Sequence, residues 1–172
     1  YEGELLLNGQ TVKYRNPTAA LKGGIGFVPQ EINVMEELTV AENIFVGHLD
    51  ERGKRVVSIA SVIRRAKSFL EENKFDLDAS ARVNTLSIGQ KQLLMVAKAL
   101  SWEPEIMILD EPTTALSQAD VDNLFEIIEN LKKNGKSIIF VTHKLAEIFE
   151  ITDRVTILRD GSVITTYEKK DY

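Results

Sequence analysis

The sequence predicts an α/β fold that combines a parallel sheet, antiparallel hairpins and a helical subdomain. An apolar strand at 105–109, a helix at 119–133 and a second strand at 136–141 follow one another. A helix that joins two strands in this order makes them run parallel. Asn-Gly at 8–9 and Asp-Gly at 160–161 are dipeptides typical of tight hairpin turns.

The first zone of the chain, residues 1–30, is expected to form short strands. Residues 4–7 and 11–14 flank the Asn-Gly turn, and the short run at 26–28 ends at Pro29, which cannot donate to a strand ladder. The sequence therefore predicts one hairpin and one separate strand here.

The middle and the end of the chain carry helical and strand signals in turn. The helix at 119–133 is stopped by Gly135, and 154–158 and 162–166 form the last hairpin. A charged segment at 51–55 precedes an apolar stripe at helical spacing. The residues of the stripe are Val62, Ile63, Ala66, Phe69 and Leu70.

Composition excludes several classes of protein. The chain has 172 residues, of which 44% are hydrophobic and 27% charged, as in ordinary globular domains. The net charge of −5 argues against a nonspecific nucleic-acid binder, which needs a basic surface. The chain has no cysteine, so disulfides and thiolate zinc sites are excluded. No apolar run is long enough to span a bilayer.

Ionisable side chains follow both strands of the parallel pair. Asp110 and Glu111 end the apolar run from 106, and His143 follows the next strand. Parallel strands place their carboxyl ends at one edge, where open sheets bind ligands. Asp110 offers a hard oxygen to Mg²⁺, and Glu111 offers a base to water. Solvated acids at a strand end are the simpler alternative.

A second candidate site is the helix start at 86–90. Ser87 and Gln90 have the spacing of a capping box. The same geometry presents a hydroxyl and backbone N–H groups to an anion, and Gly89 lets a phosphate approach without a Cβ. Both interpretations stay open. Gln30 could contact a metal or water through its amide, or be an ordinary surface residue.

The order of these motifs resembles the succession found in ATP-binding-cassette (ABC) ATPases, over essentially the whole chain. Gln30 would lie in the Q-loop, 86–90 would be the signature sequence, 106–111 Walker B, and His143 the switch histidine. Ile88 stands where most members have glycine. The resemblance implies an ABC-type P-loop NTPase core.

One branch of the family is especially similar. Segments 38–47 and 113–117 resemble the N-terminal cassette of bacterial ribose-, galactose- and xylose-type importer ATPases. That branch lacks the D-loop aspartate, whose place Ser117 takes in this chain. The family's G-x-x-x-x-G-K-[ST] phosphate loop is missing: Gly135-Lys136-Ser137 fails because position 130 is Asn130. We therefore expect a cassette without its N-terminal part, inactive alone.

The resemblance implies a role for each matching residue. Gln30 would contact Mg²⁺ or the attacking water, Asp110 would hold Mg²⁺, and Glu111 would polarise the water. His143 would hydrogen-bond the γ-phosphate of ATP. The residues implied to contact ATP held by a partner cassette are Ser87, Gly89 and Gln90.

The resemblance also implies organisation and partners. Residues 1–172 would form a single partial nucleotide-binding domain, with 1–30 and 105–172 as core sheet and 31–104 as helical subdomain. The partners would be a second cassette, membrane permease subunits and, indirectly, a periplasmic sugar-binding protein, but no nucleic acid. The location would be the cytoplasmic face of the membrane.

Two other functions remain open on the sequence alone. A degenerate, noncatalytic cassette could act as an interaction module, and a soluble ABC ATPase could serve DNA repair or translation. Repair members insert long coiled coils between Q-loop and signature, whereas Leu86 follows Gln30 by only 56 positions.

Overall fold

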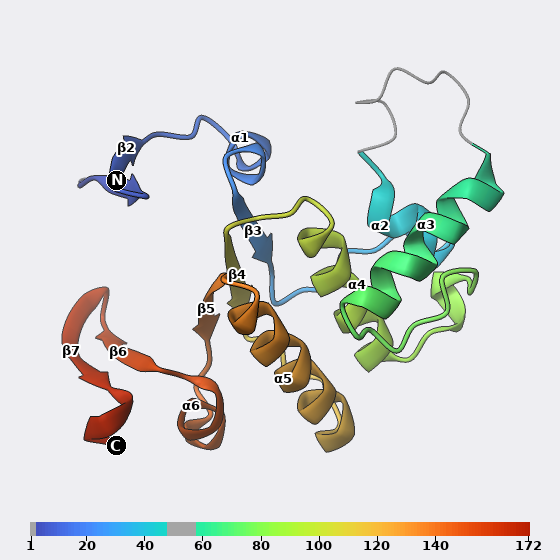
Figure 1. Cartoon of the computed structure of the whole chain (residues 1–172). Helices are drawn as coiled ribbons and strands as arrows, with labels where there is room; N and C mark the ends of the chain where they lie inside the picture. The colour runs from blue at the N-terminus through green and yellow to red at the C-terminus, as the bar shows by residue number, and fades with distance from the viewer. Residues whose placement is uncertain (1–2, 48–57) are drawn as a thin grey trace.

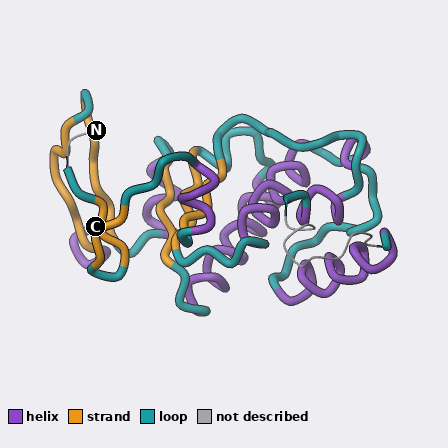
Figure 2. The backbone as a smooth tube through the Cα atoms, turned by 90° about the horizontal axis from the view of Figure 1, so that it is seen from above, coloured by secondary structure: helices purple, strands orange, loops and turns teal. Residues whose placement is uncertain are grey.

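The computed structural model describes residues 3–47 and 58–172, so the charged segment predicted at 51–55 lies outside the described residues. The elements form three layers. Two hairpins lie at one end, a three-stranded sheet lies in the middle, and helices fill the other end (Figure 1; Figure 2). The sheet therefore stands between the hairpins and the helices.

The central sheet has the order β3-β4-β5. β3 (Ile25–Val28), β4 (Ile106–Asp110) and β5 (Ser137–Val141) pair in parallel. Helix α5 (Gln118–Lys133) connects β4 to β5. The predicted strand–helix–strand unit is confirmed, with the helix beginning one residue earlier because Ser117 is its N-cap.

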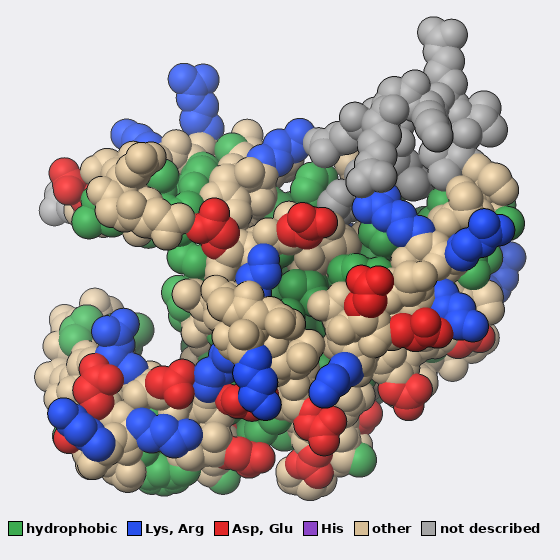
Figure 3. Space-filling view, in the orientation of Figure 1, with side chains coloured by type: hydrophobic (Ala, Val, Ile, Leu, Met, Phe, Trp, Pro, Cys, Tyr) green, Lys and Arg blue, Asp and Glu red, His purple; other side chains and the backbone are tan. Residues whose placement is uncertain are grey.

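One face of this sheet is covered by helices. Met107 and Leu109 of β4 are fully buried, on the face that packs toward α5 and α4 (Ile88–Leu100). On the other face Phe27 and Ile139 are 54% and 51% exposed. Hydrophobic side chains line part of the hollow beside the two hairpins in Figure 3.

The expected helix-rich zone is confirmed. α2 (Val40–Phe45), α3 (Ile59–Glu72) and α4 pack together, and a 3₁₀ turn, η1 (Val83–Thr85), precedes α4. The apolar stripe of α3 faces inward, because three of its residues are buried. These residues are Val62, Ala66 and Leu70.

Both predicted hairpins are present. β1 (Leu5–Leu7) pairs with β2 (Gln10–Val12) across a turn in which Asn8 and Gly9 have φ of 51° and 76°. Such positive φ values are why Asn-Gly suits this turn. β6 (Arg154–Arg159) and β7 (Ser162–Glu168) form the second hairpin, and η2 (Lys169–Asp171) ends the chain.

Two short helices were not predicted. The expectation of strands throughout 1–30 is wrong at α1 (Pro17–Lys22). Asn16 caps this helix by accepting from the Ala19 N–H at 2.8 Å, and Pro17 is preorganised for a first helical position. α6 (Leu145–Ile151) follows β5. Of the described helices, none has the length and apolar character to cross a membrane.

Candidate functional site

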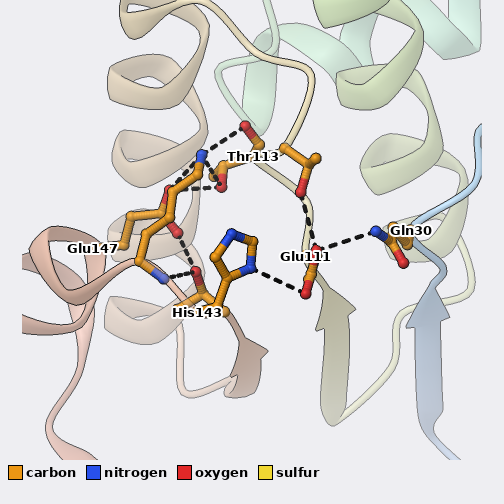
Figure 4. A network of polar contacts seen from close by, with 8 residues as sticks. Gln30, Glu111, Thr113, His143 and Glu147 are labelled. Atoms are coloured by element: carbon orange, nitrogen blue, oxygen red, sulfur yellow. Dashed lines mark hydrogen bonds and ion pairs between the residues drawn. The ribbon is translucent and has the colours of Figure 1, made fainter.

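Three loops leave the same edge of the central sheet. Parallel pairing brings the carboxyl ends of β3, β4 and β5 together, so the segments that follow them start side by side (Figure 4). Gln30 lies just beyond β3, Asp110 closes β4, Glu111 follows it, and His143 lies just beyond β5. The sheet topology thus gathers these four residues from three distant parts of the chain.

Glu111 is the centre of the cluster. Its Oε2 accepts from Nε2 of Gln30 at 3.1 Å, and its Oε1 lies 3.1 Å from Nδ1 of His143. Thr114, to which the sequence assigned no role, donates its hydroxyl to Oε2 at 3.2 Å. Gln30 and His143 point toward the Glu111 carboxylate from opposite sides in Figure 4. We call Gln30, Glu111, Thr114 and His143 the edge cluster.

The backbone of Glu111 has an unusual conformation. Its φ is 45°, in the left-handed region that costs a non-glycine residue about 1–3 kcal/mol. The Glu111 N–H donates to the carbonyl of Val141 at 3.0 Å, which ties this bend to the end of β5. Strain of this kind concentrates at functional sites. The sequence showed the acid pair but not this bend.

The protonation of His143 follows from its partner. When Glu111 is a carboxylate it can only accept hydrogen bonds, so Nδ1 of His143 is then the donor in this contact. A neutral imidazole has one N–H, which this contact uses. His143 can therefore donate to a second acceptor only by taking up a second proton or by leaving Glu111.

The residues beside the edge cluster suit a hard metal ion. Asp110 is half-buried at the end of β4, and the bond from Gln30 to Glu111 uses the amide nitrogen and not the amide oxygen. Carboxylate and amide oxygens are the ligands that Mg²⁺ prefers, and Mg²⁺ bound to nucleotide phosphates needs only one or two from the protein. Asp110 and Gln30 fit that donor set.

The predicted capping box at the start of α4 is present. Ser87 Oγ accepts from the Gln90 N–H at 3.2 Å, and Gln90 Oε1 accepts from the Ser87 N–H at 3.0 Å. Among the described residues, no hydrogen bond joins this group to the edge cluster. The sequence-predicted residues thus fall into two separate groups.

Gly89 has a packing reason to be glycine in this chain. A Cβ built there would lie 2.5 Å from Cγ of Asp120 at the start of α5. The Asp120 carboxylate cannot retreat freely, because its Oδ2 accepts from the Ser117 hydroxyl at 2.7 Å in the capping box of α5. Glycine is needed at this position because the start of α4 lies directly against the start of α5.

Gly89→Ala is expected to lower the free energy of unfolding by about 1–2 kcal/mol, the value of a lost N-cap, as measured by urea denaturation. The added methyl group would push Asp120 out of its bond to Ser117. The matched control is the same change in an Asp120→Ala background, where it should cost little. An equal cost in both backgrounds would contradict this packing role.

A buried polar group lies behind the edge cluster, and the sequence analysis missed it. Glu147 of α6 is only 6% exposed. Burial by itself would raise the pKa of its carboxyl, but hydrogen bonds from Thr113, Thr142 and Lys144 outweigh that effect and lower the pKa below its ordinary value. Glu147 is therefore held as a carboxylate inside the protein.

The ABC transporter family profile matches residues 1–114, about two thirds of the chain. The ribose import ATP-binding protein RbsA of Clostridium perfringens (strain SM101) is 41% identical over 172 residues, which cover 99% of this chain and 34% of that protein. RbsA 1 of Agrobacterium fabrum is 40% identical over 163 residues, covering 95% and 32%. The chain thus spans about a third of the length of the curated relatives it matches.

Solved structures agree with the family match. The ATP-binding cassette MJ0796 in a dimeric, post-hydrolysis state with ADP and Pi is 27% identical and has a TM-score of 0.79, covering 99% of this chain and 75% of that one. The ADP conformation of MJ1267, an ATP-binding cassette at 21% identity, has a TM-score of 0.80 with 99% and 71% covered, which shows the shared fold. The chain belongs to the ABC transporter family and has the fold of its ATP-binding cassette, with sequence close to ribose and galactose importer ATPases.

Proposed function

We propose that this chain is part of an ATP-hydrolysing cassette that energises sugar import through an ABC permease. The observation that carries the proposal is the edge cluster, in which one carboxylate is aligned by an amide from the loop after β3 and an imidazole from the loop after β5. That arrangement suits activation of a water molecule next to a phosphate. Relatives named as ribose import ATP-binding proteins support the sugar assignment.

In this proposal, each residue at the sheet edge has one task. Glu111 accepts the proton of the attacking water as a general base, and Gln30 orients that carboxylate and contacts Mg²⁺ or the water. Asp110 and the amide oxygen of Gln30 would hold Mg²⁺, which when bound would supply positive charge beside the phosphates. His143 hydrogen-bonds the γ-phosphate, which requires the change in its protonation or position derived above.

The start of α4 acts on a different nucleotide. Ser87, Gly89 and Gln90 are proposed to contact the γ-phosphate of ATP held by a second cassette. The capping box uses the Ser87 hydroxyl as an acceptor and Gln90 through its Oε1, so the hydroxyl hydrogen and the Gln90 Nε2 group are outside those two bonds. A charge-assisted hydrogen bond to phosphate contributes roughly 1.5–3 kcal/mol.

The proposed partners rest on the similarity to importer ATP-binding proteins. They are a second cassette, the permease subunits and, indirectly, a periplasmic sugar-binding protein, at the cytoplasmic face of the membrane. We propose that the chain forms one partial nucleotide-binding domain, with residues 1–30 and 105–172 around the sheet and 31–104 as the helical subdomain.

The 172-residue chain by itself is expected to bind MgATP weakly and to hydrolyse it negligibly. Its sequence contains no G-x-x-x-x-G-K-[ST] loop, and that loop supplies the backbone N–H groups and the lysine that hold the β- and γ-phosphates. Isothermal titration calorimetry with MgATP measures the binding, and phosphate release measures the hydrolysis. Tight binding by the isolated chain would contradict this expectation.

A fusion tests the catalytic part of the proposal. Joining the phosphate-loop segment of a ribose-importer relative ahead of residue 1 should produce MgATP binding and hydrolysis. The matched control replaces the loop lysine of the added segment by alanine and should abolish both. A fusion that binds MgATP but does not hydrolyse it would instead support a noncatalytic interaction module.

A further inference from the structure

We propose that Glu147 is a positioning residue, which joins the loop after β4 to the loop after β5 and thereby holds His143 against Glu111. The proposal concerns the geometry of the edge cluster. It rests on the proposed function only in that this geometry would serve ATP hydrolysis. Figure 4 shows the relevant side chains, which come from the two loops and from α6.

Glu147 contacts both loops through its two oxygens. Oε1 accepts from the Thr113 hydroxyl at 2.6 Å, and Oε2 accepts from the Thr142 hydroxyl at 2.7 Å. Thr113 stands two residues after Glu111, and Thr142 directly precedes His143. One buried carboxylate therefore fixes the chain on either side of the Glu111–His143 contact.

Lys144 contacts both Glu147 and Thr113 and so belongs to the same group. Its Nζ lies 3.2 Å from Oε1 of Glu147 and donates to the carbonyl of Thr113 at 3.0 Å. Its backbone N–H donates to the Thr142 hydroxyl at 3.1 Å. Hydrogen bonds from or to charged groups are the stronger ones in proteins, and here three residues bordering the cluster are tied together by them. We call Thr113, Thr142, Lys144 and Glu147 the anchor group.

The contact between His143 and Glu111 needs such support. The His143 side chain is 67% exposed and that of Glu111 is 27% exposed. Pairs this exposed hold their own geometry weakly, because water and salt screen them and the side chains lose entropy. The spacing of 3.1 Å between Nδ1 and Oε1 is therefore set by the loops that carry the two residues, and the anchor group holds those loops.

The tautomer of His143 reports this positioning directly. With Glu111 accepting from Nδ1–H, the neutral ring carries its proton on Nδ1, because the hydrogen bond sets which nitrogen is protonated. Long-range ¹H–¹⁵N correlation spectra of the 172-residue chain, recorded at a pH where the ring is neutral, distinguish the two tautomers. The chain has two histidines, so a His48→Gln background leaves one ring to observe.

We expect His143 to be an Nδ1–H tautomer in the wild-type chain and to lose that preference in Glu111→Ala. Glu147→Ala should produce a loss at least half as large, although Glu111 is intact. Glu150→Ala, which removes an exposed glutamate from the same helix, should leave the ring signals unchanged. A folded Glu147→Ala chain with wild-type ring signals would overturn the proposal.

Two milder variants decide the outcome if Glu147→Ala does not fold. Glu147→Gln keeps the length and one oxygen acceptor, and Thr142→Val removes both hydrogen bonds of the Thr142 hydroxyl, the one to Glu147 and the one from the Lys144 N–H. A shift of the His143 tautomer in either supports the proposal, and wild-type signals in both overturn it. No nucleotide enters the measurement, so a fusion that fails to hydrolyse ATP would refute the proposed function without touching this result.

Discussion

Glu111→Gln is expected to lower ATP hydrolysis by about 10²–10⁴-fold, the usual contribution of a positioned base. The change keeps the size of the side chain and one oxygen that accepts from Gln30 or Thr114. It removes the charge that accepts a proton from water. ATP binding should persist, because phosphates are held by other groups.

The assay uses the cassette completed by fusion to a phosphate-loop segment, with hydrolysis followed as phosphate release and binding as calorimetric heat. Glu126→Gln is the matched control, since Glu126 is an exposed glutamate on α5 and its change should leave the rate unaffected. Undiminished hydrolysis in Glu111→Gln would remove Glu111 from the role of base. A loss of ATP binding would assign Glu111 to substrate binding instead.

Glu147→Ala is expected to lower the free energy of unfolding of the chain by about 3 kcal/mol, the lower end of the range for breaking a buried charge pair. The two threonine hydroxyls would lose their acceptor. Lys144 would lose its ion pair with Glu147 but keeps its hydrogen bond to the Thr113 carbonyl, and its side chain is 39% exposed and can regain water. Urea denaturation measures the change.

Glu150→Ala is again the control, and as a surface substitution it should change stability by less than about 0.5 kcal/mol. Equal effects of the two alanine substitutions would show that the anchor group adds no stability. A loss for Glu147→Ala of only a few tenths of a kcal/mol would show that water replaces Glu147 in its bonds.

The stability of the chain should also fall in acid, in part through Glu147. Its pKa is lowered from an ordinary value of 4.5 in the folded chain, so the stabilisation is present above about pH 4.5 and is lost as the pH falls through the lower, folded value. Glu42 and Asp78 also have pKa values lowered by hydrogen bonds from Thr39 and Ser80, and they act in the same direction, Asp78 from its ordinary value of 3.8 downward. Glu147→Gln should therefore make the free energy of unfolding depend less steeply on pH, as measured by urea denaturation between pH 2.5 and 6. An unchanged slope would contradict the contribution of Glu147.

Local chemistry explains which elements could be predicted. The β4–α5–β5 unit follows from apolar periodicity, and its parallel pairing follows from handed connectivity. The capping box of Ser87 and Gln90 is read within four residues of sequence. The Asn8-Gly9 turn needs positive φ values that its residues tolerate. In each case the decisive contacts are close in the chain.

The hydrophobicity pattern of the sequence predicts the wrong buried face for helix α6. A hydrophobicity rule would bury Leu145 and Phe149, but these are 68% and 56% exposed. The helix instead buries Glu147 and Ile151, because the anchor group satisfies the carboxylate inside the protein. No spacing in the sequence reveals that Thr113, thirty-four residues away, supplies one of those bonds.

The sequence by itself determined the family resemblance, the parallel strand pair and the three ionisable residues expected at one sheet edge, because strand direction and motif order are properties of the chain. Only the tertiary structure decided that Glu111 bends into the left-handed region to meet Gln30 and His143. It also decided that Gly89 faces Asp120. Such contacts join segments far apart in sequence, and their geometry is fixed by packing and by buried hydrogen bonds that local propensity does not encode.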